Sequence, residues 1–296
     1  MRKKLLKAFP LVLLLALIVV LAAGCGGNAE NGGQNNQQSP GSGQELSGTL
    51  NLNGSTTVAP VAQAWAEAFN AKHPGVDIVV TGTGSGNGIA ALINGTTDIA
   101  MASRKIKDKE RNQINGTVKE FVVGRDGLAV IVHPNNPVEE LTMAQIKDIF
   151  TGKITNWQEV GGPDADIYVY TRDTSSGTYG FFKEFVLNDE EYTKNSRKTA
   201  SNAAMVKTVA QEEYAVGYCG LAFVDNSVKA VRVSKDGGPA VEPSIENAKA
   251  GQYPIVRDLN MYTIGEPAGL AKAFLDFGFS AEGQAMVEEV GYLPVR

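Results

Sequence analysis

Three short stretches of the sequence combine glycine with hydroxyl side chains where a strand-like run gives way to a helix-like one. They are NGSTTVAP (53–60), TGTGSGNG (81–88) and TRDTSSGT (171–178), and the third also carries Arg172. The first turn of a helix has four N–H groups without partners and the positive end of the helix dipole. Glycine lets an anion approach these groups, and hydroxyls add donors. One such stretch is usually only a helix cap. Three of them, with an arginine, predict an anion-binding site.

Residue patterns typical of catalysis do not occur in the chain. There is no G-x-x-x-x-G-K-[ST] loop, and TGTGSGNG fits neither G-x-G-x-x-G nor G-x-S-x-G. The two histidines, His73 and His133, each precede a proline in a turn-like setting, so a serine nucleophile would lack a base. No Cys/His cluster or regularly spaced carboxylate set indicates a metal. We therefore expect no catalytic residues, no metal and no cofactor, and a protein that holds its ligand without transforming it.

Strand-like and helix-like hydrophobic patterns alternate from Leu46 onward, which predicts an α/β architecture with mostly parallel sheets. The expected strands cover 48–54, 76–82, 96–103, two runs within 119–134, 165–171, 214–224 and 228–233. The expected helices cover 58–69, 86–94, 141–150, 201–211, 267–277 and 281–290, with a further one after residue 176. In such folds ligands collect where the carboxyl ends of strands meet helix N-termini, and the three stretches lie at such positions.

Local signals locate two helix starts and part of the core. Thr142 is expected to cap the helix that follows it, with Gln145 completing a capping box. Ser176 is expected to cap the helix that begins after it. Four aromatic residues recur at helical spacing and are expected to be buried in the core: Trp65, Phe69, Phe181 and Phe185.

The first 25 residues are typical of a secretory signal. Basic residues at positions 2, 3, 4 and 7 precede an apolar run from Leu11 to Leu21 and small residues up to Cys25. The end of this segment, LAAGC, resembles a bacterial lipobox, although Leu21 lies one place further from the cysteine than in the commonest pattern. We expect Cys25 to carry lipid, palmitate included, and to anchor the protein. The alternative is an ordinary cleavage site with an incidental cysteine.

The segment 26–44 contains no aliphatic residue larger than alanine, so it is predicted to be a flexible linker. Removing the four basic residues of the signal leaves 23 Lys and Arg against 32 Asp and Glu, a formal charge of −9. An exported protein this acidic is a poor candidate for binding nucleic acid or an anionic membrane surface. The other cysteine, Cys219, lies in an apolar strand pattern and is expected to be a buried thiol.

Motifs along nearly the whole chain, in the same order, resemble those of the phosphate-binding subunits of bacterial phosphate ABC transporters. They are NGSTTVAP, TGTGSGNGIAALINGTTDIAMASRKI, IFTGKITNW, TRDTSSGT, VGYCGLAFV and YPIVR. The resemblance implies a two-lobed, type II periplasmic-binding-protein fold with the anion in the interlobe cleft. Lobe one would comprise 46–130 plus 262–296 and lobe two 131–261. Two hinge crossings are expected near 129–134 and 253–262.

The resemblance also implies which residues bind phosphate. Thr56 and Thr57 match the pair at the first helix start, and Ser85 matches the serine of the second glycine-rich turn. Further matches are Arg172, Ser176, Gly177 and Thr178. Ser103 occupies a position where many family members have aspartate, and Arg104 follows it. Arg104 is either a second cation of the site or a side chain that points to solvent, and the sequence leaves both open.

The serine at position 103 matters for selectivity. Near pH 7 phosphate keeps a proton that sulfate lacks, so a buried carboxylate can accept a hydrogen bond from phosphate and repel sulfate. Ser103 can accept a hydrogen bond but has no charge. Rejection of sulfate would then depend on neutral acceptors or on another acid such as Asp126.

Together these patterns predict a monomeric, lipid-anchored receptor on the extracytoplasmic face of the cell membrane. It would capture inorganic phosphate and deliver it to the permease subunits of an ABC transporter. Alternatives are a receptor for sulfate, molybdate or tungstate, a phosphate-ester hydrolase, and an adhesin or sensor on the same scaffold. A hydrolase is disfavoured because the sequence has no metal-ligand cluster.

Overall fold

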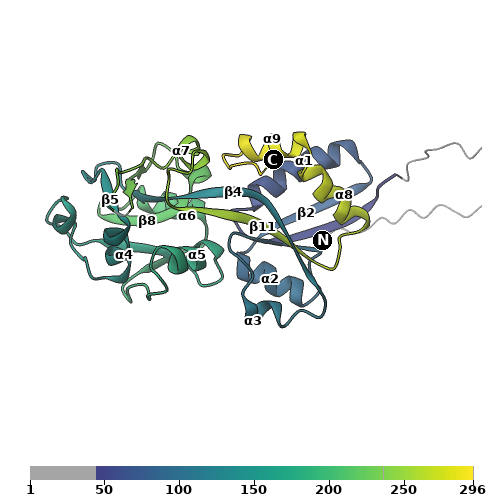
Figure 1. Cartoon of the computed structure of the whole chain (residues 1–296), viewed down its shortest axis with the longest axis horizontal. Helices are drawn as coiled ribbons and strands as arrows, with labels where there is room; N and C mark the ends of the chain where they lie inside the picture. Colours follow the sequence, from purple (N-terminus) through teal and green to yellow (C-terminus); the bar gives the residue numbers. More distant parts are fainter. Residues whose placement is uncertain (1–44, 236, 296) are drawn as a thin grey trace, which may run out of the picture. The chain divides into compact units, whose positions relative to one another are not determined.

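The computed structural model describes residues 45–235 and 237–295 (Figure 1). The predicted signal, the predicted lipidation site Cys25 and the predicted linker 26–44 lie outside these residues. Within the described part of the chain, every helix is too short or too polar to cross a membrane.

The described residues alternate between strands and helices, as the sequence patterns predict. The strands are β1 (Gly48–Gly54), β2 (Val76–Gly82), β3 (Ile99–Ala102), β4 (Val118–Val132), β5 (Glu140–Thr142), β6 (Tyr168–Arg172), β7 (Arg197–Thr199), β8 (Ala215–Gly220), β9 (Lys229–Ala230), β10 (Arg232–Ser234) and β11 (Val256–Ile264). The helices are α1 (Ala59–Lys72), α2 (Ser85–Ile93), α3 (Asp108–Arg111), α4 (Met143–Thr151), α5 (Gly177–Phe185), α6 (Asn202–Val209), α7 (Ile245–Lys249), α8 (Gly269–Gly278) and α9 (Ala281–Glu289), and two 3-10 turns are η1 (Trp157–Val160) and η2 (Leu221–Phe223). The sequence did not predict β5, β7, α3 and α7, each of five residues or fewer and too short for a hydrophobic period. It also did not predict the nine-residue strand β11, whose residues were expected only as part of a hinge crossing near 253–262.

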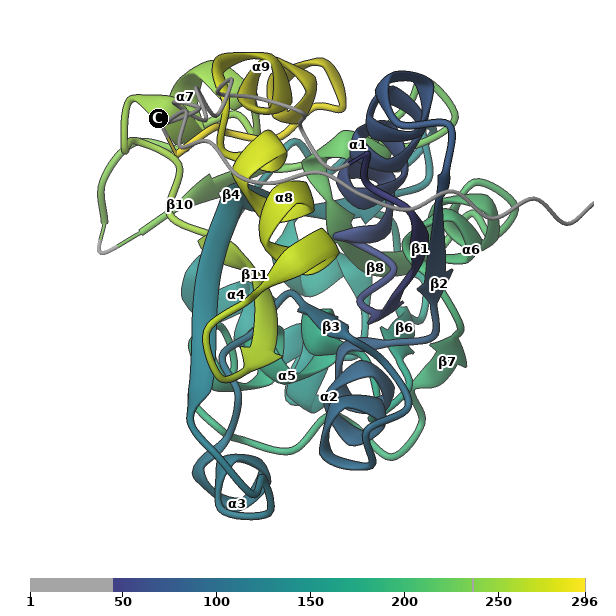
Figure 2. The ribbon, with the colours of Figure 1, turned by 90° about the vertical axis from the view of Figure 1, so that its right-hand side faces the viewer.

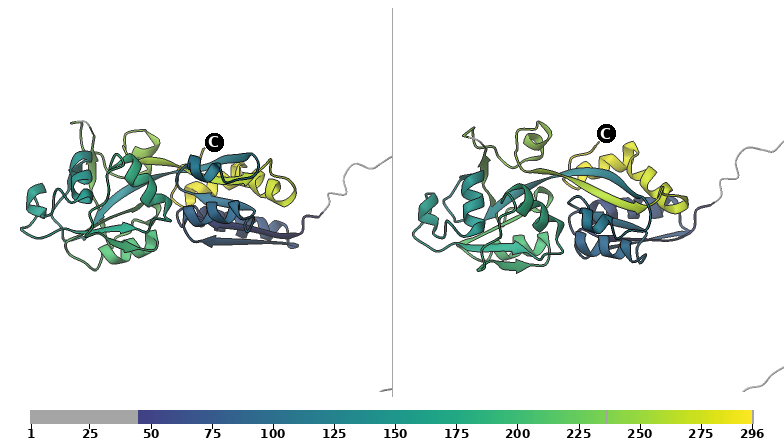
Figure 3. Two further views of the ribbon diagram at one scale, coloured as in Figure 1. Left: turned by 90° about the horizontal axis from the view of Figure 1, so that it is seen from below. Right: turned by 60° about the horizontal axis from the view of Figure 1, so that its bottom comes forward.

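The main sheet has the strand order β2-β1-β3-β11-β4-β8-β6-β7, with β9 also paired to β4. Its outer parts are parallel, because β1 pairs with β2 and β3, and β6 pairs with β7 and β8, in parallel register. Its centre is antiparallel, because β11 runs opposite to β3 and β4 and β4 runs opposite to β8. The two central strands lie side by side and connect the two parallel parts (Figures 1 and 3).

Strand β4 corrects one prediction. The sequence predicted two strand runs within 119–134, but the structure has one continuous strand that changes partner. Residues 118–127 of this strand pair with β11 and residues 128–132 pair with β8. Gly127 lies within the strand and does not form a turn. Its lack of a side chain allows close packing, since a Cβ atom there would lie 2.4 Å from Leu221 Cδ1. The predicted run 228–233 is also wrong as a single strand, since β9 pairs with β4 and β10 pairs with β5.

Apolar side chains form separate clusters on the two sides of the central strands. One cluster joins the N-terminal helix α1 to α8 and α9, and Figure 2 shows these helices grouped together, apart from α2. Trp65 and Phe69 are buried in this cluster, as predicted. Another cluster packs α4 and α5 against β6 and β8 around Phe182. The prediction that Phe185 is buried in the core is wrong, because its side chain is 42% exposed. Phe181, which was also predicted to be buried, is only half-buried and stacks on Phe185.

The capping predictions are confirmed. Thr142 accepts a hydrogen bond from the Gln145 N–H, and the Gln145 side chain accepts one from the Thr142 N–H, which completes the capping box of α4. Ser176 Oγ accepts from the Tyr179 N–H at 3.2 Å at the start of α5. The start of α5 is therefore a capped helix N-terminus directly after the end of β6.

The contact between α8 and α1 gives a testable prediction of stability. Trp65 is fully buried, and its Nε1 donates to the Gly283 carbonyl oxygen at 2.8 Å. A Cβ atom at Gly278 would lie 2.2 Å from the Trp65 ring. We expect Gly278→Ala to lower the free energy of unfolding by roughly 1–3 kcal/mol through overpacking, as measured by urea unfolding.

The control is Lys272→Ala on the exposed side of the same helix, where Lys272 forms only an exposed ion pair with Asp276. This variant should change the free energy of unfolding by less than about 0.5 kcal/mol. Equal stability of Gly278→Ala and the unmodified protein would contradict the close Trp65 contact.

Candidate functional site

The three predicted stretches come together where β1, β2 and β6 end and α1, α2 and α5 begin. Before α1, Ser55 Oγ accepts hydrogen bonds from the N–H groups of Thr57 and Val58, at 3.1 and 3.2 Å. Helix α2 begins at Ser85, and α5 begins at Gly177 after its cap, Ser176. The first-turn N–H groups and hydroxyls of three helices are thus collected in one place, as predicted.

All eight residues that the resemblance implies as phosphate ligands lie in one group, which we call the polar cluster. Its members are Thr56, Thr57, Ser85, Ser103, Arg172, Ser176, Gly177 and Thr178. Thr57 Oγ1 lies 3.3 Å from Thr178 Oγ1, and Arg172 Nη2 donates to Thr56 Oγ1 at 3.3 Å. These contacts join the stretch after β1 to the stretch after β6.

The two serines of the cluster face the start of α5. Ser85 Oγ lies 3.4 Å from Ser103 Oγ, and a Cβ atom at Gly177 would lie 2.2 and 2.6 Å from these two oxygens. Only glycine leaves room for the serine hydroxyls at this point. Apart from Thr56, which is half-buried, the members of the cluster are buried. Water therefore competes little for their hydrogen-bonding groups, and each polar contact there is stronger than at the surface.

Arg172 is the charged member of the cluster, and it is 1% exposed. Its Nε donates to the Thr199 carbonyl oxygen at 3.2 Å and its Nη2 to the Ala200 carbonyl oxygen at 2.9 Å. Burial lowers the pKa of Arg172 from its usual value, yet an arginine side chain stays protonated in proteins. Among the described residues, no carboxylate forms an ion pair with it. The structure thus holds a buried positive charge whose hydrogen-bond partners are all neutral.

Arg257 on β11 is a second arginine at this place, and the sequence reasoning assigned it no role. It is 4% exposed. Its Nη2 donates to Thr57 Oγ1 at 3.4 Å and its Nη1 to the Ser103 carbonyl oxygen at 3.3 Å. It also forms an ion pair with the buried Asp126, with Nη2 and Oδ2 2.7 Å apart. The available signal was a charged residue at the end of the otherwise apolar YPIVR motif, whose last two residues begin β11.

Asn202, the first residue of α6, was also missed. It is fully buried, and its Nδ2 donates to Thr57 Oγ1 at 2.9 Å. Its Oδ1 accepts from Arg172 Nη1 at 3.4 Å. Ser201 caps α6, so the Asn202 side chain is not needed as the cap and instead links Arg172 to Thr57. A sequence pattern shows the cap but not this long-range contact.

Arg104 is not arranged as either of the two alternatives left open by the sequence. It does not point to solvent, because it is 9% exposed. It does not contact the polar cluster through its guanidinium, which pairs with Glu110: Nη1 lies 2.8 Å from Oε2 and Nη2 lies 2.7 Å from Oε1. The second cation beside the cluster is Arg257, not Arg104.

The charges at the polar cluster favour an anion. Arg172 and Arg257 bring two buried positive charges, and Asp126 brings one negative charge. The positive ends of α1, α2 and α5 add to this balance. Within the described part of the chain, no group of three or more His, Cys, Asp or Glu side chains is arranged to hold a metal ion.

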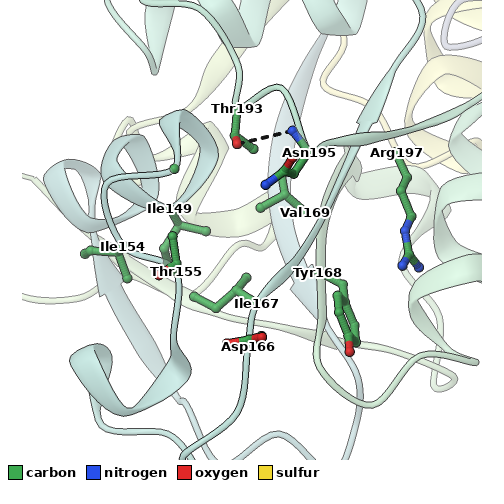
Figure 4. Close-up of a pocket in the computed structure, with 11 residues that line it drawn as sticks. Ile149, Ile154, Thr155, Asp166, Ile167, Tyr168, Val169, Thr193, Asn195 and Arg197 are labelled. Atoms are coloured by element: carbon green, nitrogen blue, oxygen red, sulfur yellow. Dashed lines mark hydrogen bonds between the residues drawn. The ribbon is translucent and has the colours of Figure 1, made fainter.

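Two surface cavities lie outside the polar cluster. The cavity in Figure 4, of about 420 Å³, lies beside β6 and β7, where its lining includes Tyr168, Thr193 and Arg197. None of the predicted ligand residues lines it. Another cavity, of about 640 Å³, is lined by Arg104, Phe181 and Arg257 among others, so Arg257 belongs both to its wall and to the surroundings of the polar cluster.

Comparisons with known proteins agree with this geometry. Residues 36–282 match the model of the PBP superfamily domain. The chain is 34% identical over 286 residues to the phosphate-binding protein PstS of Bacillus subtilis, covering 96% of this chain and 93% of that protein. It is 33% identical over 271 residues to PstS of Pseudomonas aeruginosa, covering 84% of each chain.

Solved structures give the same result. A putative phosphate ABC transporter substrate-binding protein from Clostridium perfringens, with bound phosphate, matches with a TM-score of 0.78 and 41% identity, over 84% of this chain and all of that one. An ABC-type phosphate transport receptor from Vibrio cholerae matches with a TM-score of 0.69 and 33% identity, over 83% of this chain and all of that one. The predicted α/β fold of the type II periplasmic-binding-protein class is confirmed. The chain therefore belongs to the PBP superfamily and, within it, to the family of the phosphate-binding protein PstS.

Proposed function

We propose that this protein captures inorganic phosphate at the polar cluster and delivers it to the permease of an ABC transporter. The observation that carries the proposal is the buried Arg172 guanidinium, which has only neutral partners and lies where three helix N-termini meet. An anion with several acceptor oxygens is the complement of such a site. Support comes from the relatives named PstS and from the Clostridium perfringens structure, which has bound phosphate.

Phosphate binding by the polar cluster is consistent with the usual strength of such contacts. A hydrogen bond to a charged group contributes about 1.5–3 kcal/mol, and a helix N-terminus adds roughly 0.3–1 kcal/mol. A micromolar dissociation constant needs about −8 kcal/mol. The hydroxyls of Thr56, Thr57 and Ser85, the first-turn N–H groups and the Arg172 guanidinium together can offset the desolvation of the anion and reach this value.

We place the hinge between the two proposed lobes on β4 and β11. The partner of β4 changes at Gly127 and Leu128, slightly before the predicted crossing 129–134, and β11 begins at Val256, within the predicted crossing 253–262. Lobe one would contribute Thr57, and lobe two would contribute Thr178. Bending at these strands would bring the two groups around the anion, and docking on the permease would separate them.

Binding without chemistry is the favoured reading of the site. The relatives are transport binding proteins. His73 packs on Phe69, and His133 Nδ1 accepts from the Asn135 N–H, so both histidines are engaged in local contacts. We further propose that the chain acts on the extracytoplasmic side as a monomer and is anchored through lipid on Cys25. The proposed export and lipid anchor follow from the signal pattern of the sequence.

Loss of the buried charge should weaken binding strongly. Removing one partner of a buried charge pair typically costs about 2–5 kcal/mol, so Arg172→Gln is expected to raise the phosphate dissociation constant roughly 30-fold to several thousand-fold. Isothermal titration calorimetry measures this change, and circular dichroism confirms that the variant is folded.

The matched control is Arg197→Gln. Arg197 lies on the neighbouring strand β7 and contacts Tyr168 and Tyr170, outside the polar cluster. Its replacement should leave the phosphate dissociation constant within about twofold, as expected for a surface charge. An Arg172→Gln protein with unchanged affinity would refute the role of Arg172.

The identity of the anion can be tested with the unmodified protein. We expect calorimetric titration at pH 7 to show tight binding of phosphate and much weaker binding of sulfate, because a site with a carboxylate beside it penalises an anion that carries no proton. Molybdate and tungstate serve as further competitors. Equal affinity for sulfate and phosphate would contradict the phosphate assignment and favour a general oxyanion receptor.

A further inference from the structure

A row of buried hydroxyl groups runs from the end of β6 to the first turn of α5. Thr171 Oγ1 lies 2.8 Å from Tyr218 Oη, and Tyr218 Oη lies 2.9 Å from Tyr192 Oη. Tyr192 Oη in turn donates to the Tyr179 carbonyl oxygen at 3.1 Å. Thr171 and Tyr218 are fully buried, and Tyr192 is 9% exposed. We call these four residues the hydroxyl chain.

The protons of the hydroxyl chain can point in one direction only. The Tyr179 carbonyl oxygen can only accept, so it takes the single proton of the Tyr192 hydroxyl. The Tyr192 oxygen then accepts from Tyr218, and the Tyr218 oxygen accepts from Thr171. Burial raises the pKa of Tyr218 to about 12 and the pKa of Tyr192 well above its usual value, so both keep their protons near pH 7. Every hydroxyl proton of the chain thus has an acceptor, and a satisfied buried network makes the elements that it joins rigid.

The two ends of the hydroxyl chain enclose the ligand residues of the third stretch. Thr171 directly precedes Arg172, and Tyr179 directly follows Thr178. The Tyr179 N–H donates to the cap Ser176 at 3.2 Å, while the Tyr179 carbonyl oxygen accepts from the hydroxyl chain. The segment 172–178 is therefore fastened at both ends by buried hydrogen bonds that lie outside the segment itself.

Ring packing holds the two inner tyrosines independently of their hydroxyls. The Tyr218 ring stacks on Phe182, with the centroids 4.0 Å apart and the planes at 9°. The Tyr192 ring stacks on Tyr179, with the centroids 4.6 Å apart. Replacing either tyrosine with phenylalanine therefore keeps the packing of the rings and removes only the hydrogen bonds.

We propose that Tyr192 and Tyr218 are positioning residues of the anion site, which hold Arg172 and the start of α5 in their binding arrangement before the anion arrives. The proposal rests on the proposed function and adds to it two residues that act through the segment 172–178. A site that is already arranged loses less conformational entropy when its ligand binds, so it binds more tightly. Without the hydroxyl chain the anion itself would have to order this segment, and the cost would raise the dissociation constant.

A purely structural role for the hydroxyl chain makes a different prediction. If the chain only stabilised the fold, its loss would lower the free energy of unfolding of the free and the bound protein equally. The phosphate dissociation constant of the folded protein would then stay the same. Affinity and stability therefore separate the two roles.

The first experiment measures the phosphate dissociation constants of Tyr218→Phe and Tyr192→Phe by calorimetry. We expect each variant to bind phosphate about threefold to thirtyfold more weakly, because each leaves one buried group of the chain without its partner. The matched control is Tyr262→Phe. Tyr262 is also fully buried, but its hydroxyl bonds with Glu120 and with the Ile106 N–H, outside the segment 171–179. Its replacement should leave the dissociation constant within about twofold.

Hydrogen exchange of the ligand-free protein tests the positioning directly. In Tyr218→Phe, peptides that cover residues 172–178 should exchange their amide protons faster than in the unmodified protein. The same peptides should be unchanged in Tyr262→Phe. Faster exchange spread evenly over the molecule would indicate a loss of global stability and contradict the proposal.

A conservative pair at Thr171 completes the test and decides it if a tyrosine variant does not fold. Thr171→Val keeps the shape of the side chain without the hydroxyl and should weaken phosphate binding as the tyrosine variants do. Thr171→Ser keeps the hydroxyl and should bind phosphate almost as the unmodified protein does. Unchanged affinity in the folded variants that lack a hydroxyl would overturn the proposal. A failure of the unmodified protein to bind phosphate would instead overturn the proposed function.

Discussion

The arrangement of this site depends on a guanidinium that has been taken out of water without a carboxylate partner. Carbonyl oxygens and one amide hold Arg172 in place at the end of β6, but none of them neutralises its charge. Transfer of an unpaired charge into a protein interior is costly unless an opposite charge arrives. The capped start of α5, the hydroxyls of α1 and α2 and the close approach at Gly177 all surround the place where that opposite charge would lie.

The resemblance of the motifs, more than any single pattern, made the site predictable from the sequence. Glycine and hydroxyl residues at helix starts are local signals, and the structure brings all three stretches together as expected. The capping box at Thr142 and Gln145 was equally local and equally visible. Such features depend on residues three or four apart, so a sequence displays them directly.

The parts that the sequence did not reveal depend on contacts between distant residues. Arg257 meets Asp126 across 131 positions of the chain, and Asn202 meets Thr57 across 145. The orientation of the Arg104 side chain is set by its salt bridge with Glu110, which holds the guanidinium away from the polar cluster. The sequence predicted two strand runs within 119–134, but β4 is continuous there and Gly127 packs against Leu221. Neither propensity nor hydrophobic period carries information of this kind.

The cross-strand pairing of Asp126 and Arg257 has a consequence for how the halves of the protein behave before a ligand arrives. If the hinge lies at Val256 on β11, and not at the predicted lobe boundary after residue 261, Arg257 belongs with Thr57 and Ser103, while Arg172 belongs with Thr178 and Asn202. Each half would therefore bring one guanidinium to the shared site. Burial lowers the pKa of Arg172 most, and the like charge of Arg257 lowers it further. In the proposed two-lobed arrangement these like charges would oppose closure, and a bound anion between them would favour it, while Asp126 already balances part of the charge of Arg257. The ligand would then act as the counter-ion of Arg172, the guanidinium for which the described part of the chain provides no carboxylate partner.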